Sequence, residues 1–307
     1  MSPPPAIETL GLSKSFGDTT AVADLTLSIP QGQMFALVGP DGAGKTTVLR
    51  LLCGVLAPTD GTVRILGMEL PREQERIKRS IGYFSQGFSL YGDLSVDENI
   101  EFFAEIHGVE EFRKRREELL QFTRLEPFRR RQADRLSGGM KQKLALVCTL
   151  IHRPSLLLLD EPTTGVDPVS RRDFWVILSS LMTEEITVLL TTPYLDEAER
   201  CHQVGMLQSG RLLVADSPAA LRRRLGGTLL EIICSEVRRA FAVLKESSLI
   251  AEVQIFGDRL DVLLDNRTVQ ENQIRELLRR EGIDILGWRA VQPRLENLFI
   301  SLMKAEG

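Results

Sequence analysis

A glycine-rich segment flanked by two apolar runs constrains the fold of this chain more than any other feature. Residues 34–38 form the first run, the segment itself covers residues 39–46, and residues 47–52 form the second run. An apolar strand, a glycine-rich loop and a helix in this order fit the phosphate-binding pattern G-x-x-x-x-G-K-[ST]. The chain is therefore predicted to be an α/β protein with a nucleotide site at the end of this strand.

The residue types within the loop indicate what it binds. Gly42 and Gly44 let the backbone approach a phosphate, and the N–H groups at the helix start point at its oxygens. Lys45 is expected to neutralise the β- and γ-phosphates of ATP, and the Thr46 hydroxyl to ligate Mg²⁺. An ordinary glycine-rich turn would need no Lys-Thr pair at this spacing. The candidate phosphate-binding residues are Gly39, Pro40, Asp41, Gly42, Ala43, Gly44, Lys45, Thr46 and Thr47.

A pair of carboxylates ends a second apolar run, at residues 156–160. Asp160 should emerge at the carboxyl edge of a buried strand, where nucleotides sit in open α/β sheets, and is a candidate Mg²⁺ partner. Glu161 follows it and could orient or deprotonate the attacking water. Such a pair could also be a solvated turn, but Pro162 and the upstream phosphate loop favour the catalytic interpretation.

The sequence Leu-Ser-Gly-Gly-Met at residues 136–140 resembles the signature motif of ATP-binding cassette (ABC) ATPases. Taken alone, Ser137, Gly138 and Gly139 would only cap a helix. In the family this motif contacts the γ-phosphate of a nucleotide held by the other subunit. The resemblance therefore implies a head-to-tail dimer with two ATP molecules, formed with a second copy or with a different ATP-binding subunit.

Other positions match family elements in the expected order, over roughly residues 5–220. Phe16 resembles the aromatic residue that stacks on adenine, although a lone phenylalanine is more often part of a core. Gln86 matches the glutamine that reaches Mg²⁺ and the attacking water. Asp167 matches a position in a loop that, in the family, crosses the dimer interface. The resemblance thus assigns catalysis to Lys45, Gln86 and Glu161, with Thr46, Gln86 and Asp160 holding Mg²⁺.

Pro193 departs from the family pattern at the position where a switch histidine usually stands. Proline has no side-chain donor and no backbone N–H, so it cannot hydrogen-bond a γ-phosphate. The chain's histidines lie in segments that match other parts of the cassette. We therefore expect ATP binding and dimerisation with slow hydrolysis, or with help from a partner, from Thr192 or from Tyr194.

Composition limits the partners and the location. The chain of 307 residues has 43% hydrophobic residues and a net charge of −4, which gives no overall attraction to nucleic acid. No apolar stretch approaches the roughly 20 residues that span a bilayer, and the first residues do not resemble a secretory signal. Any membrane role is therefore expected to be peripheral, and the resemblance to ABC ATPases implies the cytoplasmic face of the cell membrane.

The pattern predicts two domains. An ABC ATPase domain is expected at residues 1–224, with a helical subdomain inserted at about residues 87–150. A small α+β domain is expected at residues 225–307, after Gly226 and Gly227. Its strands are predicted at residues 229–234, 251–256, 259–264 and 283–291, and its helices at residues 235–246, 269–281 and 294–304. This β-α-β-β-α-β order is typical of a ferredoxin-like fold.

The segment at residues 291–300 resembles the tail of drug-resistance and related ABC-2 type exporter ATPases. The sequence thus predicts an ATP-hydrolysing subunit that drives ABC-2 type permeases, with residues 88–94 as candidates for permease contact. One alternative is a regulatory subunit whose hydrolysis is impaired by Pro193. The other is a non-transport ABC ATPase acting on ribosomes or DNA, although the paired cassettes or long coiled coils usual in such proteins are missing from this sequence.

Overall fold

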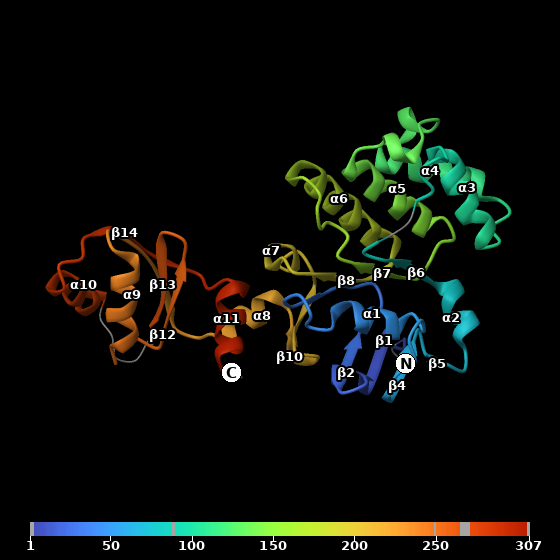
Figure 1. Ribbon diagram of the computed structural model, residues 1–307. Helices are drawn as coiled ribbons and strands as arrows, with labels where there is room; N and C mark the ends of the chain where they lie inside the picture. The colour runs from blue at the N-terminus through green and yellow to red at the C-terminus, as the bar shows by residue number, and fades with distance from the viewer. Residues whose placement is uncertain (1–2, 88–89, 249, 265–270, 306–307) are drawn as a thin grey trace. The chain divides into compact units, whose positions relative to one another are not determined.

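The computed structural model describes residues 3–87, 90–248, 250–264 and 271–305 (Figure 1). Phe88 and Ser89, within the predicted permease-contact segment, lie outside these residues. The chain forms two compact units, residues 1–215 and residues 216–307, which are treated separately below. The division falls before helix α8 (Pro218–Arg224), whereas the sequence suggested a boundary after it. The reason is that α8 packs against the last helix, α11 (Leu295–Ala305).

A six-stranded sheet forms the centre of the first unit, with the strand order β10-β9-β3-β8-β7-β6. The pairs β3/β8, β3/β9, β7/β8 and β6/β7 are parallel. Every residue of β3 and β7 is buried, as a parallel sheet covered on both faces requires. The strands are β3 (Met34–Val38), β6 (Ile81–Phe84), β7 (Leu156–Asp160), β8 (Thr187–Thr192), β9 (Gln203–Gln208) and β10 (Arg211–Asp216).

An antiparallel sheet with the strand order β2-β1-β4-β5 is drawn below the parallel one in Figure 1. Helix α1 (Lys45–Leu52) follows β3, and its buried residues join both sheets in one hydrophobic core. Burying one side of α1 against each sheet fixes the loop that precedes it. The antiparallel strands are β1 (Ile7–Phe16), β2 (Thr19–Ile29), β4 (Asp60–Ile65) and β5 (Met68–Leu70), and α2 (Gln74–Ser80) leads from them to β6.

The predicted helical insertion gathers beside the carboxyl end of β6 (Figure 1). Its first helix, α3 (Val96–Ile106), begins with a capping box in which the Ser95 side chain and the Glu98 side chain each bond the other's backbone. Buried Asn99 bonds Tyr91 and Leu94 and so ties the incoming loop to α3. The insertion also contains α4 (Phe112–Thr123) and α5 (Gly138–Leu150), with short 3₁₀ turns at Glu126–Phe128 and Ala133–Arg135. Outside it, α6 (Pro168–Leu181) and a 3₁₀ turn at Met182–Glu184 follow β7, and α7 (Leu195–Ala198) follows β8.

The second unit has the predicted ferredoxin-like topology. Its sheet has the order β12-β13-β11-β14, and every neighbouring pair is antiparallel. Helices α9 and α10 pack on one face through an apolar core. The elements are β11 (Thr228–Cys234), α9 (Val237–Glu246), β12 (Glu252–Phe256), β13 (Arg259–Leu264), α10 (Glu271–Arg280) and β14 (Ile285–Val291). The first two residues of the helix predicted at 269–281 lie outside the described residues.

Within the described residues, no helix has both the length and the apolar character needed to cross a bilayer.

Candidate nucleotide site

A pocket of about 550 Å³ opens where β3 and β7 end. This is the edge of the sheet at which the carboxyl ends of parallel strands meet. All the phosphate-loop residues from Asp41 to Thr47 contribute to its wall. Its lining residues are Ala21, Asp41, Gly42, Ala43, Gly44, Lys45, Thr46, Thr47, Gln86, Glu161, Thr164, Pro193 and Tyr194.

The loop between β3 and α1 depends on glycine at two close approaches. Gly44 caps α1 with a φ of 102°, a left-handed conformation that residues with a Cβ atom rarely adopt. A Cβ atom on Gly44 would also overlap the carbonyl oxygen of Ala21, and one on Gly39 would overlap that of Leu207. The loop is therefore held in one shape, with the N-terminus of α1 facing the pocket.

Lys45 lines the pocket and is only 5% exposed. Its Nζ donates to the carbonyl oxygens of Gly39 at 2.9 Å and Pro40 at 3.1 Å. The same Nζ lies 3.2 Å from Oε1 of Glu161. The lysine charge is therefore held by the loop and by the candidate base, both of which an incoming phosphate could replace.

Glu161 brings several predicted residues together. Its Oε2 accepts hydrogen bonds from Gln86 Nε2 and from the Thr164 hydroxyl, each at 3.2 Å. Its backbone has a φ of 48°, which costs roughly 1 kcal/mol or more for a residue other than glycine. Its backbone N–H donates to the Thr191 hydroxyl at 3.0 Å, which helps to hold this conformation. Such local strain is common where a side chain is aimed at a substrate.

Asp160 is buried at the end of β7 and has one carboxylate oxygen without a partner. Its Oδ1 accepts from the hydroxyls of Thr191 at 2.8 Å and Thr46 at 3.1 Å. Its Oδ2 is buried and has no hydrogen-bond partner. Magnesium prefers oxygen ligands and is usually bound by one or two carboxylates together with substrate phosphates. The unpartnered Oδ2 beside the Thr46 hydroxyl therefore fits the Mg²⁺ that the family implies.

The environment of Asp160 disfavours its charged form. Burial raises the pKa of the Asp160 carboxyl above its ordinary value, and the neighbouring Glu161 adds to the rise. The hydroxyls of Thr191 and Thr46 oppose it. No group of three or more histidine, cysteine or acidic side chains that could hold a metal occurs among the residues that the structure describes. A cation at Asp160 would thus depend on phosphate oxygens as well.

The end of β8 is held by a buried glutamate that the sequence did not single out. Glu197, 1% exposed, accepts from the hydroxyl of Thr163 at 2.6 Å and from that of Thr192 at 2.7 Å. It thus connects the segment after β7 to the segment that carries Pro193 and Tyr194. The one sequence signal was an acidic residue in the short helix after β8, and nothing in the spacing indicated its partners.

Phe16, predicted to stack on adenine, does not line the pocket. It lies at the end of β1, half-exposed, with the Nζ of Lys14 5.2 Å from its ring centre. Ala21, from the neighbouring strand β2, lines the pocket instead. The role predicted for Phe16 stays a prediction.

The signature residues are also separate from the pocket within this chain. Ser137 caps α5, where its hydroxyl accepts from a backbone N–H at 3.3 Å, and Gly138 and Gly139 begin the helix. A Cβ atom on Gly139 would overlap the Ser170 side chain, so the start of α5 can approach α6 closely only with glycine there. Asp167 caps α6 through two backbone N–H groups.

The three histidines do not line the pocket either. His202 accepts from the Met34 backbone N–H at 3.0 Å. His107 and His152 stack on each other with ring centres 3.8 Å apart. The structure therefore offers no histidine in place of Pro193 at the site.

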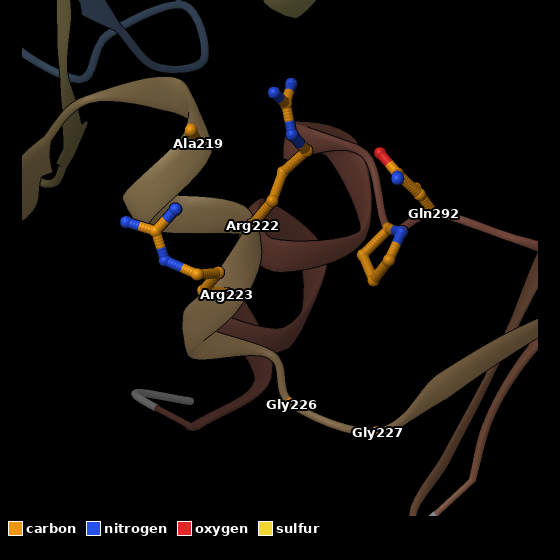
Figure 2. Close-up of a pocket in the computed structure, with 7 residues that line it drawn as sticks. Ala219, Arg222, Arg223, Gly226, Gly227 and Gln292 are labelled. Atoms are coloured by element: carbon orange, nitrogen blue, oxygen red, sulfur yellow. The ribbon is translucent and has the colours of Figure 1, made fainter.

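A second hollow, of about 460 Å³, lies in the second unit between the end of α8 and the segment before α11 (Figure 2). Figure 2 shows Arg222 and Arg223 projecting from different sides of α8, with Gln292 facing the Arg222 side. Its lining has no carboxylate or nucleophile, so it offers no group for acid–base or covalent chemistry.

Comparison with known proteins agrees with this geometry. The sequence profile of a family described as ABC transporter matches residues 22–164. Among solved structures, an ATP-binding subunit of an ABC transporter superposes with a TM-score of 0.66 at 30% identity, over 72% of this chain and 93% of that one. A dimeric bacterial ABC transporter cassette gives a TM-score of 0.63 at 28% identity, over 69% of this chain and 98% of that one.

Curated relatives extend the similarity. The Nod factor export ATP-binding protein I of Rhizobium sp. (strain N33) is 35% identical over 98% of both chains. The linearmycin resistance ATP-binding protein of Bacillus subtilis is 30% identical over 95% of this chain and 96% of its own length. A probable multidrug ABC transporter ATP-binding protein of Escherichia coli is 39% identical over 70% of this chain, which spans only 38% of that relative. This chain therefore belongs to the ABC transporter family of ATP-binding subunits and resembles its exporter members.

Proposed function

We propose that this protein is the ATP-hydrolysing subunit of an ABC exporter, acting on ABC-2 type permeases from the cytoplasmic face of the cell membrane. The observation that carries the proposal is the convergence of Lys45, Gln86 and Glu161 in one pocket beside the unpartnered oxygen of Asp160. A lysine, an amide and two carboxylates at a phosphate loop are the groups that phosphoryl transfer to water needs.

Each side chain would have a distinct task. Lys45 would release Glu161 and neutralise the phosphates of ATP. Glu161, freed from that ion pair but still bonded by Gln86 and Thr164, would accept a proton from the attacking water. Asp160 and the Thr46 hydroxyl, with Gln86, would hold Mg²⁺, which offsets charge on the phosphate oxygens. The strained backbone of Glu161 keeps its carboxylate directed at the pocket.

A dimer would complete the site. Ser137, Gly138 and Gly139 begin α5 away from the pocket of their own chain, so their backbone donors are available to a nucleotide held by a second subunit. The similarity to a cassette described as dimeric supports this arrangement. The partner would be a second copy or a different ATP-binding subunit.

An export role rests on the relatives. Proteins named for Nod factor export and for linearmycin resistance match this chain over nearly its whole length, second unit included. The cargo is not specified by either similarity, because fold and family do not determine which molecule is moved.

A second candidate is a regulatory subunit that binds ATP but turns it over slowly. Pro193 lines the pocket and has no group that can donate a hydrogen bond, which favours this candidate. Loss of one donor to a developing charge costs about a hundredfold or more in rate, whereas ATP binding can survive.

Steady-state hydrolysis of Mg-ATP by the purified chain decides between them. Clear turnover that falls about a hundredfold or more in Glu161→Gln, with ATP binding retained, is the result expected of an ATPase. Turnover equal to that of Glu161→Gln, with ATP still bound, would overturn the proposal for the isolated chain and leave the regulatory subunit.

A further inference from the structure

The segment after β8 forms part of the wall of the candidate nucleotide pocket. Pro193 and Tyr194 both line the pocket together with Lys45 and Glu161. Bound ATP carries charge on its terminal phosphate, and that charge needs donors from more than one side. The hydrogen-bond donors on this segment therefore determine whether it can contact the terminal phosphate.

Thr192 cannot supply such a donor. Its side chain is 1% exposed, and its single hydroxyl hydrogen is directed to Oε2 of Glu197 at 2.7 Å. The same hydroxyl accepts from the Tyr194 backbone N–H at 3.0 Å. Glu197 is itself fixed by the Thr163 hydroxyl at 2.6 Å. Thr192 is thus fully used in holding the segment, and Pro193 has no N–H or side-chain donor.

The ring of Tyr194 has a contact within the protein, whereas its hydroxyl makes no hydrogen bond within the part of the chain that the structure describes. The guanidinium of Arg171 lies 5.2 Å from its ring centre, and Arg171 is in turn within 3.5 Å of Asp196 and 3.9 Å of Glu197. The side chain is 37% exposed. Among the residues that the structure describes, the hydroxyl has no hydrogen-bond partner. A phenylalanine would serve the ring contact equally well, so this contact does not involve the hydroxyl.

We propose that the Tyr194 hydroxyl donates a hydrogen bond to the terminal phosphate of ATP, a contact that Pro193 cannot make. The proposal rests on the proposed ATP site and adds a substrate-contacting residue to it. Glu197 and Arg171 are positioning residues, because they hold the backbone and the ring of Tyr194. The contact would exist with ATP and be lost with ADP, since ADP has no γ-phosphate.

Nucleotide affinities measured in a Glu161→Gln background test this without relying on turnover. Adding Tyr194→Phe keeps the ring under Arg171 and removes only the hydroxyl. We expect the affinity for ATP to fall about tenfold, as loss of one hydrogen bond to a charged group predicts, and the affinity for ADP to stay unchanged. Adding Pro193→His to Tyr194→Phe should restore part of the preference for ATP, because imidazole returns a donor to the segment.

Tyr91→Phe is the matched control. Tyr91 is also exposed, at 45%, and packs against Phe102 away from the pocket, so this change should leave both affinities unchanged. An unchanged affinity for ATP in Tyr194→Phe, or an equal loss for ATP and ADP, would overturn the proposal while leaving the ATP site intact. A Glu161→Gln protein that is folded by circular dichroism but binds neither nucleotide would overturn the proposed function itself.

Discussion

Both units of this protein bury carboxylates in sheet strands, but among the described residues only those of the second unit are paired with arginines. In the first unit, Asp160 leaves Oδ2 without a partner and forms no ion pair among the described residues. In the second unit, Oε2 of Glu231 also makes no hydrogen bond to any described residue, but Glu231 lies within 3.4 Å of Arg259, 2.6 Å of Arg289 and 3.9 Å of Arg294. One carboxylate has no paired cation in the described chain and accepts from Thr46, a residue of the pocket wall, whereas the other is paired with three arginines.

The second unit's charges belong to a polar row across its sheet. Strand pairing places Gln254 beside Asp261, Asp261 beside Glu231, and Glu231 beside Arg289. Gln254, Asp261 and Glu231 are all buried, on the face away from α9 and α10. Asn297 of α11 donates to Asp261 Oδ2 at 2.9 Å and to Gln254 Oε1 at 3.1 Å, so the row also fixes the last helix.

This difference in pairing distinguishes a carboxylate of a candidate binding site from carboxylates that stabilise the fold. A buried carboxylate that is paired with cations stabilises one arrangement of the fold. A buried carboxylate with no paired cation and with one oxygen lacking a hydrogen-bond partner lowers the stability of the ligand-free protein, and a bound ligand can offset this loss. Substitutions in the two units should therefore change stability with opposite signs.

The largest loss of stability is expected for Arg259→Met. Arg259 is 24% exposed and pairs with two buried carboxylates, Glu231 and Asp261, which would be left with less compensation. We expect a loss of about 3 kcal/mol in the free energy of unfolding of the second unit. Urea unfolding followed by Trp288 fluorescence, in a Trp175→Phe background, would measure it.

Arg280→Met is the control for this prediction. Arg280 pairs with Glu276 at 2.7 Å, but both side chains are exposed, so the change should cost under about 0.5 kcal/mol. Equal effects of the two substitutions would contradict the view that the polar row supports the fold.

A smaller loss is expected for Asn297→Ala. Its amide bonds Gln254 and Asp261, and its Oδ1 accepts from the Arg294 backbone N–H at 2.9 Å. Leaving these buried partners unsatisfied should cost about 2 kcal/mol, by the same unfolding measurement. Asn272→Ala, on the exposed side of α10, should change stability by less than about 0.5 kcal/mol. A loss as small for Asn297 would mean that α11 is held by its apolar contacts alone.

Asp160→Asn should change stability in the opposite direction. The amide can still accept from Thr46 and Thr191, and it removes a buried charge, so the metal-free protein should gain about 1 kcal/mol. The pKa of Asp160 is raised in the folded protein, so its ionised form lowers the free energy of unfolding. This loss of stability is absent at a pH below the unfolded-state pKa and complete at a pH above the folded-state pKa.

The gain in Asp160→Asn should therefore appear as pH rises through the carboxyl range, and vanish below it. Thermal unfolding in EDTA across this range would measure it. Added Mg-ATP should stabilise the wild type and not the variant. A variant less stable than wild type at neutral pH without metal would show that Asp160 is a support, like Glu231.

Sequence reasoning found the residues whose roles depend on local spacing. Lys45 and Thr46 follow from one loop pattern, and the order of strands and helices was enough to predict the ferredoxin-like unit. The contacts of Glu197 with Thr163 and Thr192 were not predictable, because they join residues 34 and 5 positions apart in the sequence whose side chains meet only in the folded chain. The left-handed backbone of Glu161 also has no sequence signal, since it arises from strand ends that meet only in the folded sheet.

The polar row and the division between the two compact units depend on related features of the fold. Whether Glu231 faces Asp261 or an apolar neighbour is decided by strand register, and each strand read alone is mostly apolar. The packing of α8 on α11 joins helices from opposite ends of the second unit, so composition near Gly226 suggested a boundary after α8. Long-range pairing decides both features.

The smallest effect is expected for Arg289→Met, although this arginine makes the shortest ion pair with Glu231, at 2.6 Å. Its side chain is 63% exposed, so water and salt screen the attraction, and Arg259 and Arg294 remain to pair with Glu231. We expect a loss of about 0.5 kcal/mol, less still in 1 M salt, by the same unfolding measurement. A cost as large as that of Arg259→Met would mean that distance, rather than burial, decides how much each cation contributes to the row.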